Sequence, residues 1–242
     1  MKEEKIRIGK AAEMLDVTVQ TLRNWEKSGK LRAHRSVGGQ RYYELQDIQH
    51  FMLDIEKLGW AWAASAQVPE ISDEYYSERH DRFTSRLEKM IVVLLRELGS
   101  DAEDVVSLLG LIAGEIGDNS FAHNIGNWPD VPGVFFTYNI DKRIIVLADR
   151  GRGVLTTLRH VRPNLDNDVD ALRVAFTEVV SGRSPEKRGN GLKVIRGVAE
   201  SKEIGLLLRS GLGTVGIPKR PGSMDISMAK ENVRGVYAVI TF

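Results

Sequence analysis

The feature that most constrains this fold is a change of pattern about a quarter of the way along the chain. Before it, short helical repeats of apolar residues alternate with tight turns. Beyond it, two much longer stretches keep helical spacing, about residues 73–98 and 101–123, and strand-like runs are predicted at residues 134–140, 144–147, 204–209 and 236–242. Between the two patterns, residues 59–72 mix Trp60, Trp62 and Pro69 with small and polar residues, which is typical of a partly packed linker. The sequence therefore predicts two domains, residues 1–58 and 73–242, joined by a linker at residues 59–72.

Composition excludes several classes of protein. Of the 242 residues, 42% are hydrophobic, which is enough for buried cores, and 34 Lys plus Arg against 33 Asp plus Glu leave a net charge of only +1. Any binding to nucleic acid must therefore come from a local patch. The absence of cysteine excludes disulfides and thiolate chemistry, and the apolar run at residues 91–95 is too short to cross a bilayer. We expect a soluble, cytoplasmic protein with no membrane partner.

The first domain has the pattern of a helix-turn-helix. Apolar spacing predicts helices over residues 8–15 and 19–27, with Thr18 as the cap of the second, and a third helix over residues 45–58. The second of two such helices can lie in the major groove of DNA. It would present four polar side chains to the bases: Gln20, Arg23, Asn24 and Lys27.

A basic patch follows this helix. Between residues 27 and 41 the chain carries five positive charges and no acid: Lys27, Lys30, Arg32, Arg35 and Arg41. Short strands on either side of Gly38 and Gly39 predict a hairpin, or wing. The wing would bring Arg35, Arg41 and Tyr42 to the phosphate backbone, where such contacts position a protein without selecting a base sequence.

Residues 8–43 resemble the MerR-type winged helix-turn-helix domain, including its excisionase-like versions. The resemblance covers the segment from Thr21 to Glu26 and the wing residues Arg35, Gly39, Arg41, Tyr42 and Tyr43. It implies that the chain binds double-stranded DNA. MerR regulators continue into a long dimerising helix, whereas this chain continues with a different pattern, so formation of a homodimer stays open.

Three motifs mark the second domain. Asp149 and the glycines Gly151 and Gly153 follow a strand-like run, so a carboxylate stands beside backbone that a ligand can approach. Glu115 and Asn119 lie four apart on one face of a predicted helix, where a carboxylate can orient water and an amide oxygen can ligate Mg²⁺. The run Arg188-Gly189-Asn190-Gly191 opens another helix, whose backbone N–H groups can cradle phosphate.

These motifs, in this order, resemble the GHKL ATPases, the Bergerat-fold group that includes gyrase, MutL and the sensor histidine kinases, over about residues 101–242. The resemblance implies an α+β sandwich in which helices cover one face of a mixed sheet. It also implies the following roles: Glu115 as general base, Asn119 as Mg²⁺ ligand, Asp149 as adenine partner, Gly151 and Gly153 as the hinge of an ATP lid that spans residues 153–188, Gly189 and Gly191 as the phosphate loop, Arg188 and Lys193 near the triphosphate, and Gly235 as the family's final glycine.

Taken together, the sequence predicts a DNA-binding regulator or adaptor. Its GHKL domain would bind and hydrolyse Mg·ATP and act as a nucleotide switch. Two alternatives stay open: an anti-sigma-like Ser/Thr kinase that acts on a partner protein, and a non-catalytic ATP-binding interaction module. The sequence does not decide whether the chain is an ATPase or a kinase, because Glu115 can deprotonate either water or a hydroxyl group.

Overall fold

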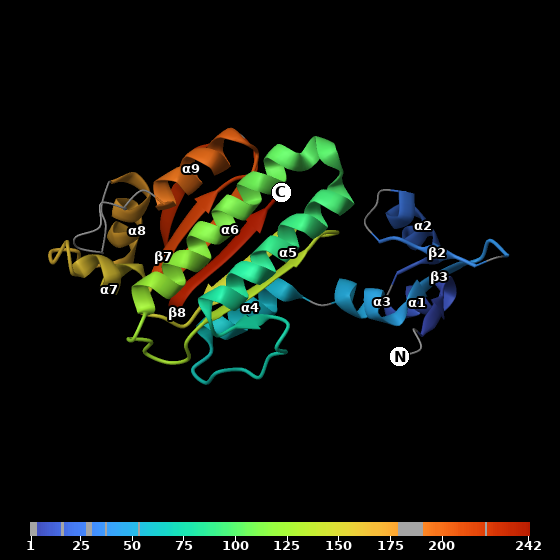
Figure 1. Cartoon of the computed structure of the whole chain (residues 1–242), viewed down its shortest axis with the longest axis horizontal. Coiled ribbons are helices and arrows are strands. Elements are labelled where there is room, and N and C mark those ends of the chain that lie inside the picture. The colour runs from blue at the N-terminus through green and yellow to red at the C-terminus, as the bar shows by residue number, and fades with distance from the viewer. Residues whose placement is uncertain are drawn as a thin grey trace. The chain divides into compact units, whose positions relative to one another are not determined.

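A computed structural model describes residues 4–15, 17–27, 31–36, 38–52, 54–178, 191–220 and 222–242. The chain forms two compact units, one built mainly from Met1–Asp54 and the other mainly from residues 55–242 (Figure 1). The division lies at residues 54 and 55, a few residues before the expected end of the first domain. Residues 59–64, which we expected in the linker, belong to a helix of the second unit.

The first unit is a three-stranded antiparallel sheet with three helices. The strand order is β1-β3-β2, and the elements are β1 (Lys5–Arg7), α1 (Ile8–Met14), α2 (Val19–Lys27), β2 (His34–Arg35), β3 (Arg41–Glu44) and α3 (Leu45–Met52). Its core joins residues from every helix, among them Ala11, Leu22, Tyr43 and Ile48, all fully buried. The helix predicted over residues 45–58 is shorter than expected, because α3 ends at Met52 and a separate helix begins at Ile55.

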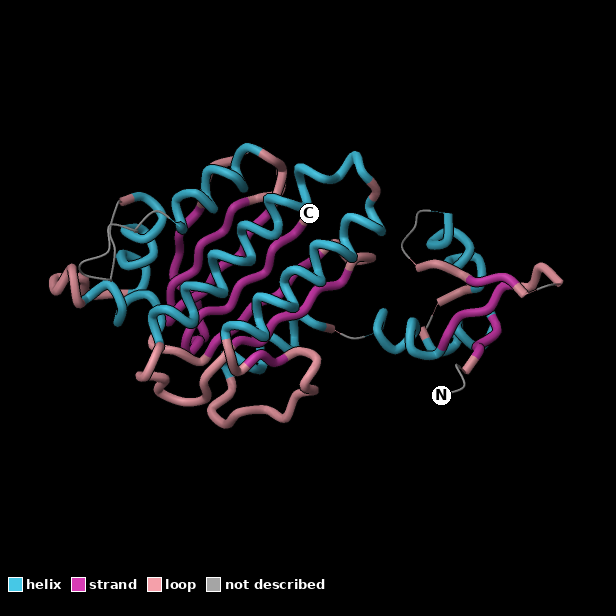
Figure 2. The backbone as a smooth tube through the Cα atoms, viewed as in Figure 1, coloured by secondary structure: helices cyan, strands magenta, loops and turns pink. Residues whose placement is uncertain are grey.

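The second unit is a five-stranded antiparallel sheet of order β4-β5-β6-β8-β7 with helices packed against it (Figure 2). In chain order its elements are α4 (Ile55–Ala64), β4 (Tyr76–Ser77), α5 (His80–Leu98), a 3₁₀ turn (Ser100–Ala102), α6 (Glu103–Asn124), β5 (Val134–Asn139), β6 (Ile144–Asp149), α7 (Gly153–Arg159), α8 (Asp168–Thr177), α9 (Gly191–Ser201), β7 (Gly205–Ile217) and β8 (Asp225–Thr241).

The expectation of a mixed sheet is wrong. β8 is antiparallel to both β6 and β7, and β4 is antiparallel to β5. The connections within the β5–β6 and β7–β8 pairs have the same consequence, since both are shorter than the crossover that parallel strands need. β7 and β8 also extend well beyond the predicted segments 204–209 and 236–242, because their shared hairpin continues through polar, exposed positions that carry no apolar signal.

The expectation that helices cover only one face of the sheet is also wrong. α5 and α6 run across one face (Figure 1), and Ser120 of α6 bonds to Asp149 on that face. α4 packs on the opposite face, where a Cβ added to Gly59 would lie 2.5 Å from Val146 of β6. Burial on both faces explains why every residue of β6 is buried and why its sequence is a continuous apolar run.

One further helix is shorter than expected. The helix predicted over residues 73–98 begins only at His80, because Tyr76 and Ser77 form a short strand paired with β5. Among the described residues, one helical segment, Ser100–Asn124, is long and apolar enough to cross a membrane. Half of its 18-residue apolar window is buried inside the second unit, which is the behaviour of a core helix.

Candidate functional sites

The four side chains expected on the recognition helix share one exposed surface of α2. Gln20, Arg23, Asn24 and Lys27 are all exposed, and the Nε2 of Gln20 donates to the Oδ1 of Asn24 at 3.2 Å. Their spacing of three and four residues places them on one side of a helix. The opposite side carries Leu22, which is fully buried in the core.

Local contacts fix where α2 begins and how it packs. The backbone N–H of Thr21 donates to the Oγ1 of Thr18 at 3.0 Å, which confirms Thr18 as the N-cap. Trp25 packs against Phe51 of α3 with ring centroids 5.0 Å apart. Trp25 and Leu22 are therefore core residues, as the sequence indicated, and the exposed residues are left for a partner.

The wing is a short hairpin between β2 and β3. Gly39 has a φ of +74°, which L side chains rarely adopt, and its N–H donates to the carbonyl of Ser36 at 2.8 Å. Arg35 and Arg41 are direct partners across the two strands. Tyr42 is half-buried and stacks on His34 with ring centroids 5.4 Å apart. The expected wing residues thus lie on one hairpin.

Glu26 belongs to the segment that resembles a MerR recognition helix, but its contacts with the wing were not predicted from the sequence. Its carboxylate accepts from Arg41 at 2.5 Å and from Arg35 at 3.1 Å, so one acid of the recognition helix holds both wing arginines. The hydrogen bond from Arg41 is the main reason that the pKa of Glu26 is lowered. Glu26 lies one position before the interval in which we counted no acid, and the basic patch therefore has a smaller net charge than its sequence indicated.

In the second unit, the middle of α6 meets the start of α9. Glu115 and Asn119 are half-buried on α6, and Gly191 is the first residue of α9. A Cβ added to Gly191 would lie 2.2 Å from the Oε2 of Glu115 and 3.6 Å from the Nδ2 of Asn119. Two of the three motifs, more than seventy residues apart in the chain, are thus brought into contact.

Asp149 forms the centre of a second cluster at the end of β6. Its carboxylate is buried, with Oδ2 accepting from the Oγ of Ser120 at 2.6 Å and Oδ1 accepting from the N–H of Gly151 at 2.8 Å. A Cβ on Gly235 would lie 2.0 Å from Oδ1. Burial raises the pKa of Asp149, while the hydrogen bonds act against that rise. A carboxylate has about four acceptor positions, so Asp149, which accepts from Ser120, Gly151 and the backbone of Val236, can accept one more hydrogen bond from a ligand amine.

The residues after this carboxylate are held by two buried polar side chains. The N–H of Arg152 donates to the Oδ1 of Asn124 at 2.9 Å, and the N–H of Val154 donates to the Oγ of Ser210 at 2.9 Å. Gly153 has a φ of +74°. The turn is therefore fixed by hydrogen bonds to its backbone from α6 and from β7.

Some expected site residues are not brought together here. Arg188 and Gly189 lie outside the described residues, so the structure does not place them. Lys193 is on the first turn of α9 and is half-buried. The expected lid, residues 153–188, includes α7 and α8 in its described part.

Three polar residues that contact the Asp149 turn, Ser120, Asn124 and Ser210, were missed. Ser120 and Asn124 interrupt the buried face of an otherwise apolar helix, one and five positions after Asn119. A buried polar residue needs a hydrogen-bond partner, so this interruption is a signal that could have identified them. Ser210 carries no comparable signal, because it stands in a strand whose length the sequence did not indicate.

Comparison with known proteins supports the prediction of a DNA-binding domain in the first unit. Residues 7–43 match the family described as MerR family regulatory protein. The match covers α1, α2 and both strands of the wing, so this part of the chain is a MerR-type helix-turn-helix domain and indicates a DNA-binding regulator. Searches of curated proteins and of solved structures find no match to the chain.

Proposed function

We propose that this chain is a cytoplasmic DNA-binding regulator whose second unit binds Mg·ATP in a GHKL-type site and hydrolyses it, with the nucleotide acting as a switch. The DNA-binding half rests on the match at residues 7–43 and on the exposed polar face of α2. The nucleotide half rests on one observation. Three motifs that are distant in sequence meet along α6: Gly191 lies beside Glu115 and Asn119 of that helix, and Asp149 of β6 bonds to its Ser120.

The residues present fit a magnesium nucleotide. A carboxylate and an amide on one face of α6 offer the hard oxygen donors that Mg²⁺ prefers. Gly191 and Gly235 let the backbone pack closely against Glu115 and Asp149, because an added Cβ would lie 2.2 Å and 2.0 Å from their carboxylate oxygens. Magnesium, when bound, would neutralise charge on the phosphate groups. Glu115 would take the proton of the attacking water, and Asp149 would accept a hydrogen bond from the exocyclic amine of adenine.

The test is calorimetric titration of the purified full chain with a non-hydrolysable ATP analogue and Mg²⁺, together with a phosphate-release assay using ATP. We expect binding by the parent and loss of turnover with retained binding in Glu115→Gln. Asp118→Asn is the matched control, since Asp118 is an exposed acid on the same helix that pairs with His80. If Glu115→Gln and Asp118→Asn turn over ATP equally, Glu115 is not the base. If the parent binds no nucleotide, the proposal is wrong.

The DNA-binding half has its own test. Selection from a random duplex pool should return a preferred sequence for the parent, and changing Arg23 or Asn24 should alter that preference. Arg41→Ala should leave it unchanged, because a phosphate contact does not select a base sequence. The opposite pattern would place the recognition surface on the wing and not on α2.

A further inference from the structure

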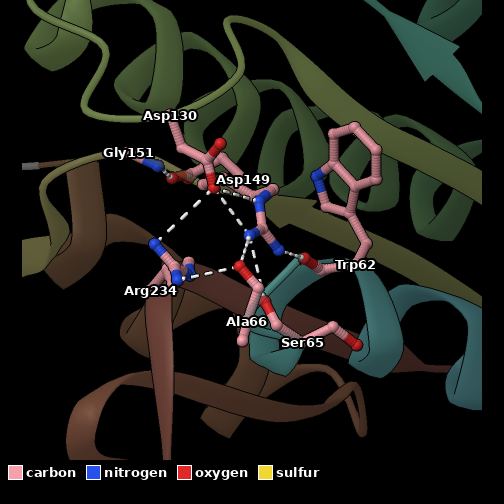
Figure 3. Close-up of polar contacts among 8 residues, drawn as sticks. Trp62, Ser65, Ala66, Asp130, Asp149, Gly151 and Arg234 are labelled. Carbon is pink, nitrogen blue, oxygen red and sulfur yellow. Dashed lines mark hydrogen bonds and ion pairs between the residues drawn. The ribbon is translucent and has the colours of Figure 1, made fainter. Parts of the chain in front are cut away.

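Arg150 stands between Asp149 and Gly151 in the chain, and its side chain is completely buried. The guanidinium makes contacts with the Oδ2 of Asp130 from Nε at 2.7 Å and from Nη2 at 2.6 Å. Nη1 donates to the carbonyl of Trp62, and Nη2 donates to the carbonyls of Ser65 at 3.0 Å and Ala66 at 3.4 Å. Figure 3 shows these partners gathered in one network.

The carbonyl partners are at the C-terminal end of α4. Trp62 lies in its last turn, and Ser65 and Ala66 follow directly after it. The last carbonyls of a helix have no partner within the helix and carry the negative end of the helix dipole, so a cation there is favourable. A buried cation is stable only when its donors are satisfied, and Arg150 meets this condition through one carboxylate and three carbonyls.

Consecutive strand residues point to opposite faces of a sheet, and this alternation links the network to the candidate nucleotide site. Asp149 points to the face covered by α6, where it bonds to Ser120, whereas Arg150 points to the face covered by α4. The Asp149 to Gly151 turn is therefore held from both faces. Arg234, next to Gly235, joins the same network through the carbonyl of Ala66 at 3.0 Å.

We propose that Arg150 is a positioning residue for nucleotide recognition. By fixing the turn to the C-terminal end of α4, its guanidinium sets the position of the Asp149 carboxylate and hence the preference for adenine over guanine. The inference rests on the proposed function of the second unit. Lysine cannot replace the arginine, because an ammonium group lacks the planar fork that reaches a carboxylate and several carbonyls at once.

Arg86 provides a matched control. It is a partly buried arginine of the same unit, and its guanidinium donates to the carbonyls of Glu74 and Phe136 and to the Oγ of Ser77. Its contacts tie α5 to β4 and β5, on which none of the candidate nucleotide residues lie. Arg86→Lys therefore tests the loss of a structural arginine without a change at the turn.

The experiment measures affinity for non-hydrolysable ATP and GTP analogues with Mg²⁺ by calorimetry, using the parent, Arg150→Lys and Arg86→Lys as full chains. We expect both variants to lower the thermal midpoint. Only Arg150→Lys should reduce the ratio of ATP to GTP affinity, by about tenfold, the size of effect expected when one hydrogen bond to a charged group is lost. Arg86→Lys should leave the ratio within about twofold of the parent value, a difference within ordinary error.

A second variant keeps the test decisive if Arg150→Lys does not fold. Asp130→Asn removes the charge partner of Arg150 while leaving its carbonyl contacts, and it should shift the same ratio in the same direction. An unchanged ratio in both Arg150→Lys and Asp130→Asn, with nucleotide still bound, would overturn the inference and leave the proposed function standing. A parent chain that binds neither analogue would remove both.

Discussion

Replacing Asp149 by asparagine should have opposite effects on binding and on stability. The side chains have the same shape, so the amide oxygen can accept from the N–H of Gly151 and the amide nitrogen can donate to the Oγ of Ser120. The buried negative charge, however, is removed. We expect Asp149→Asn to fold, to bind nucleotide more weakly than the parent, and to be more stable than the parent without ligand at neutral pH.

The binding loss follows from the bond that adenine would lose. A hydrogen bond to a charged group contributes about 1.5–3 kcal/mol, so affinity for the ATP analogue should fall about 10- to 150-fold. The stability gain follows from burial, which raises the pKa of Asp149. A difference of one pKa unit between the folded and unfolded states corresponds to about 1.4 kcal/mol. For a domain as long as the second unit, each kcal/mol of added stability raises Tm by about 2–4 °C.

The pH dependence of stability is a second consequence of the same raised pKa of Asp149. A carboxyl group with a raised folded-state pKa stabilises the fold fully below its unfolded pKa, and that contribution is lost as pH rises through the folded pKa. The stability of the parent relative to Asp149→Asn should therefore decrease as pH rises from about 4 to neutral. Asp225→Asn, which removes an exposed charge at the start of β8, should show no such difference.

The measurements are thermal unfolding of the three proteins across this pH range and calorimetric titration with the ATP analogue at neutral pH. An Asp149→Asn variant that is less stable than the parent at neutral pH, with an unchanged pH slope, would refute the argument from burial. Unchanged affinity for the analogue would refute the assignment of Asp149 as the adenine partner.

Three further predictions concern other parts of the chain. Arg41→Ala should weaken binding to all duplexes and lower the slope of log affinity against log salt by roughly one, as measured by fluorescence anisotropy; an unchanged slope would mean that Arg41 serves only Glu26. Because the pKa of Glu26 is lowered, its stabilising effect is present above about pH 4.5 and is lost as pH falls through the folded value, so Glu26→Gln should make the stability of the first unit less dependent on pH in acid, as followed by the tryptophan fluorescence to which Trp25 contributes. Gly235→Ala should cost about 1–3 kcal/mol of stability in denaturant titrations and weaken nucleotide binding, since its Cβ would lie 2.0 Å from a carboxylate oxygen; parent-like values in both assays would contradict the geometry.

The first unit was largely predictable because its signals are local. Thr18 caps α2, the apolar spacing around Leu22 sets the buried side of that helix, and Gly39 supplies the left-handed conformation that the wing requires. Each signal depends on residues only a few positions apart. Glu26 escaped detection because its two arginine partners lie nine and fifteen residues away, across a turn and a hairpin.

In the second unit the sequence indicated the motifs but not their surroundings. Residues four apart on a helix share a face whatever the fold, so Glu115 and Asn119 could be paired without a structure. Strand direction could not be derived in the same way. The predictions of a mixed sheet and of helices on only one of its faces were both wrong. Trp60 and Trp62 were assigned to a linker because a run of small residues beside aromatic ones has the same composition in a linker and in a packed helix.

The sequence by itself therefore determined the features that depend on helical or strand period and on the conformation of single residues. These are α2 and its exposed face, the wing turn, and the existence of three glycine or carboxylate motifs. Only the tertiary structure decided which motifs meet, that α4 covers the second face of the sheet, and that Arg150 is buried against the end of that helix. The physical reason is that these contacts join residues more than seventy positions apart. Their position depends on how helices and strands pack, which no local pattern of residues encodes.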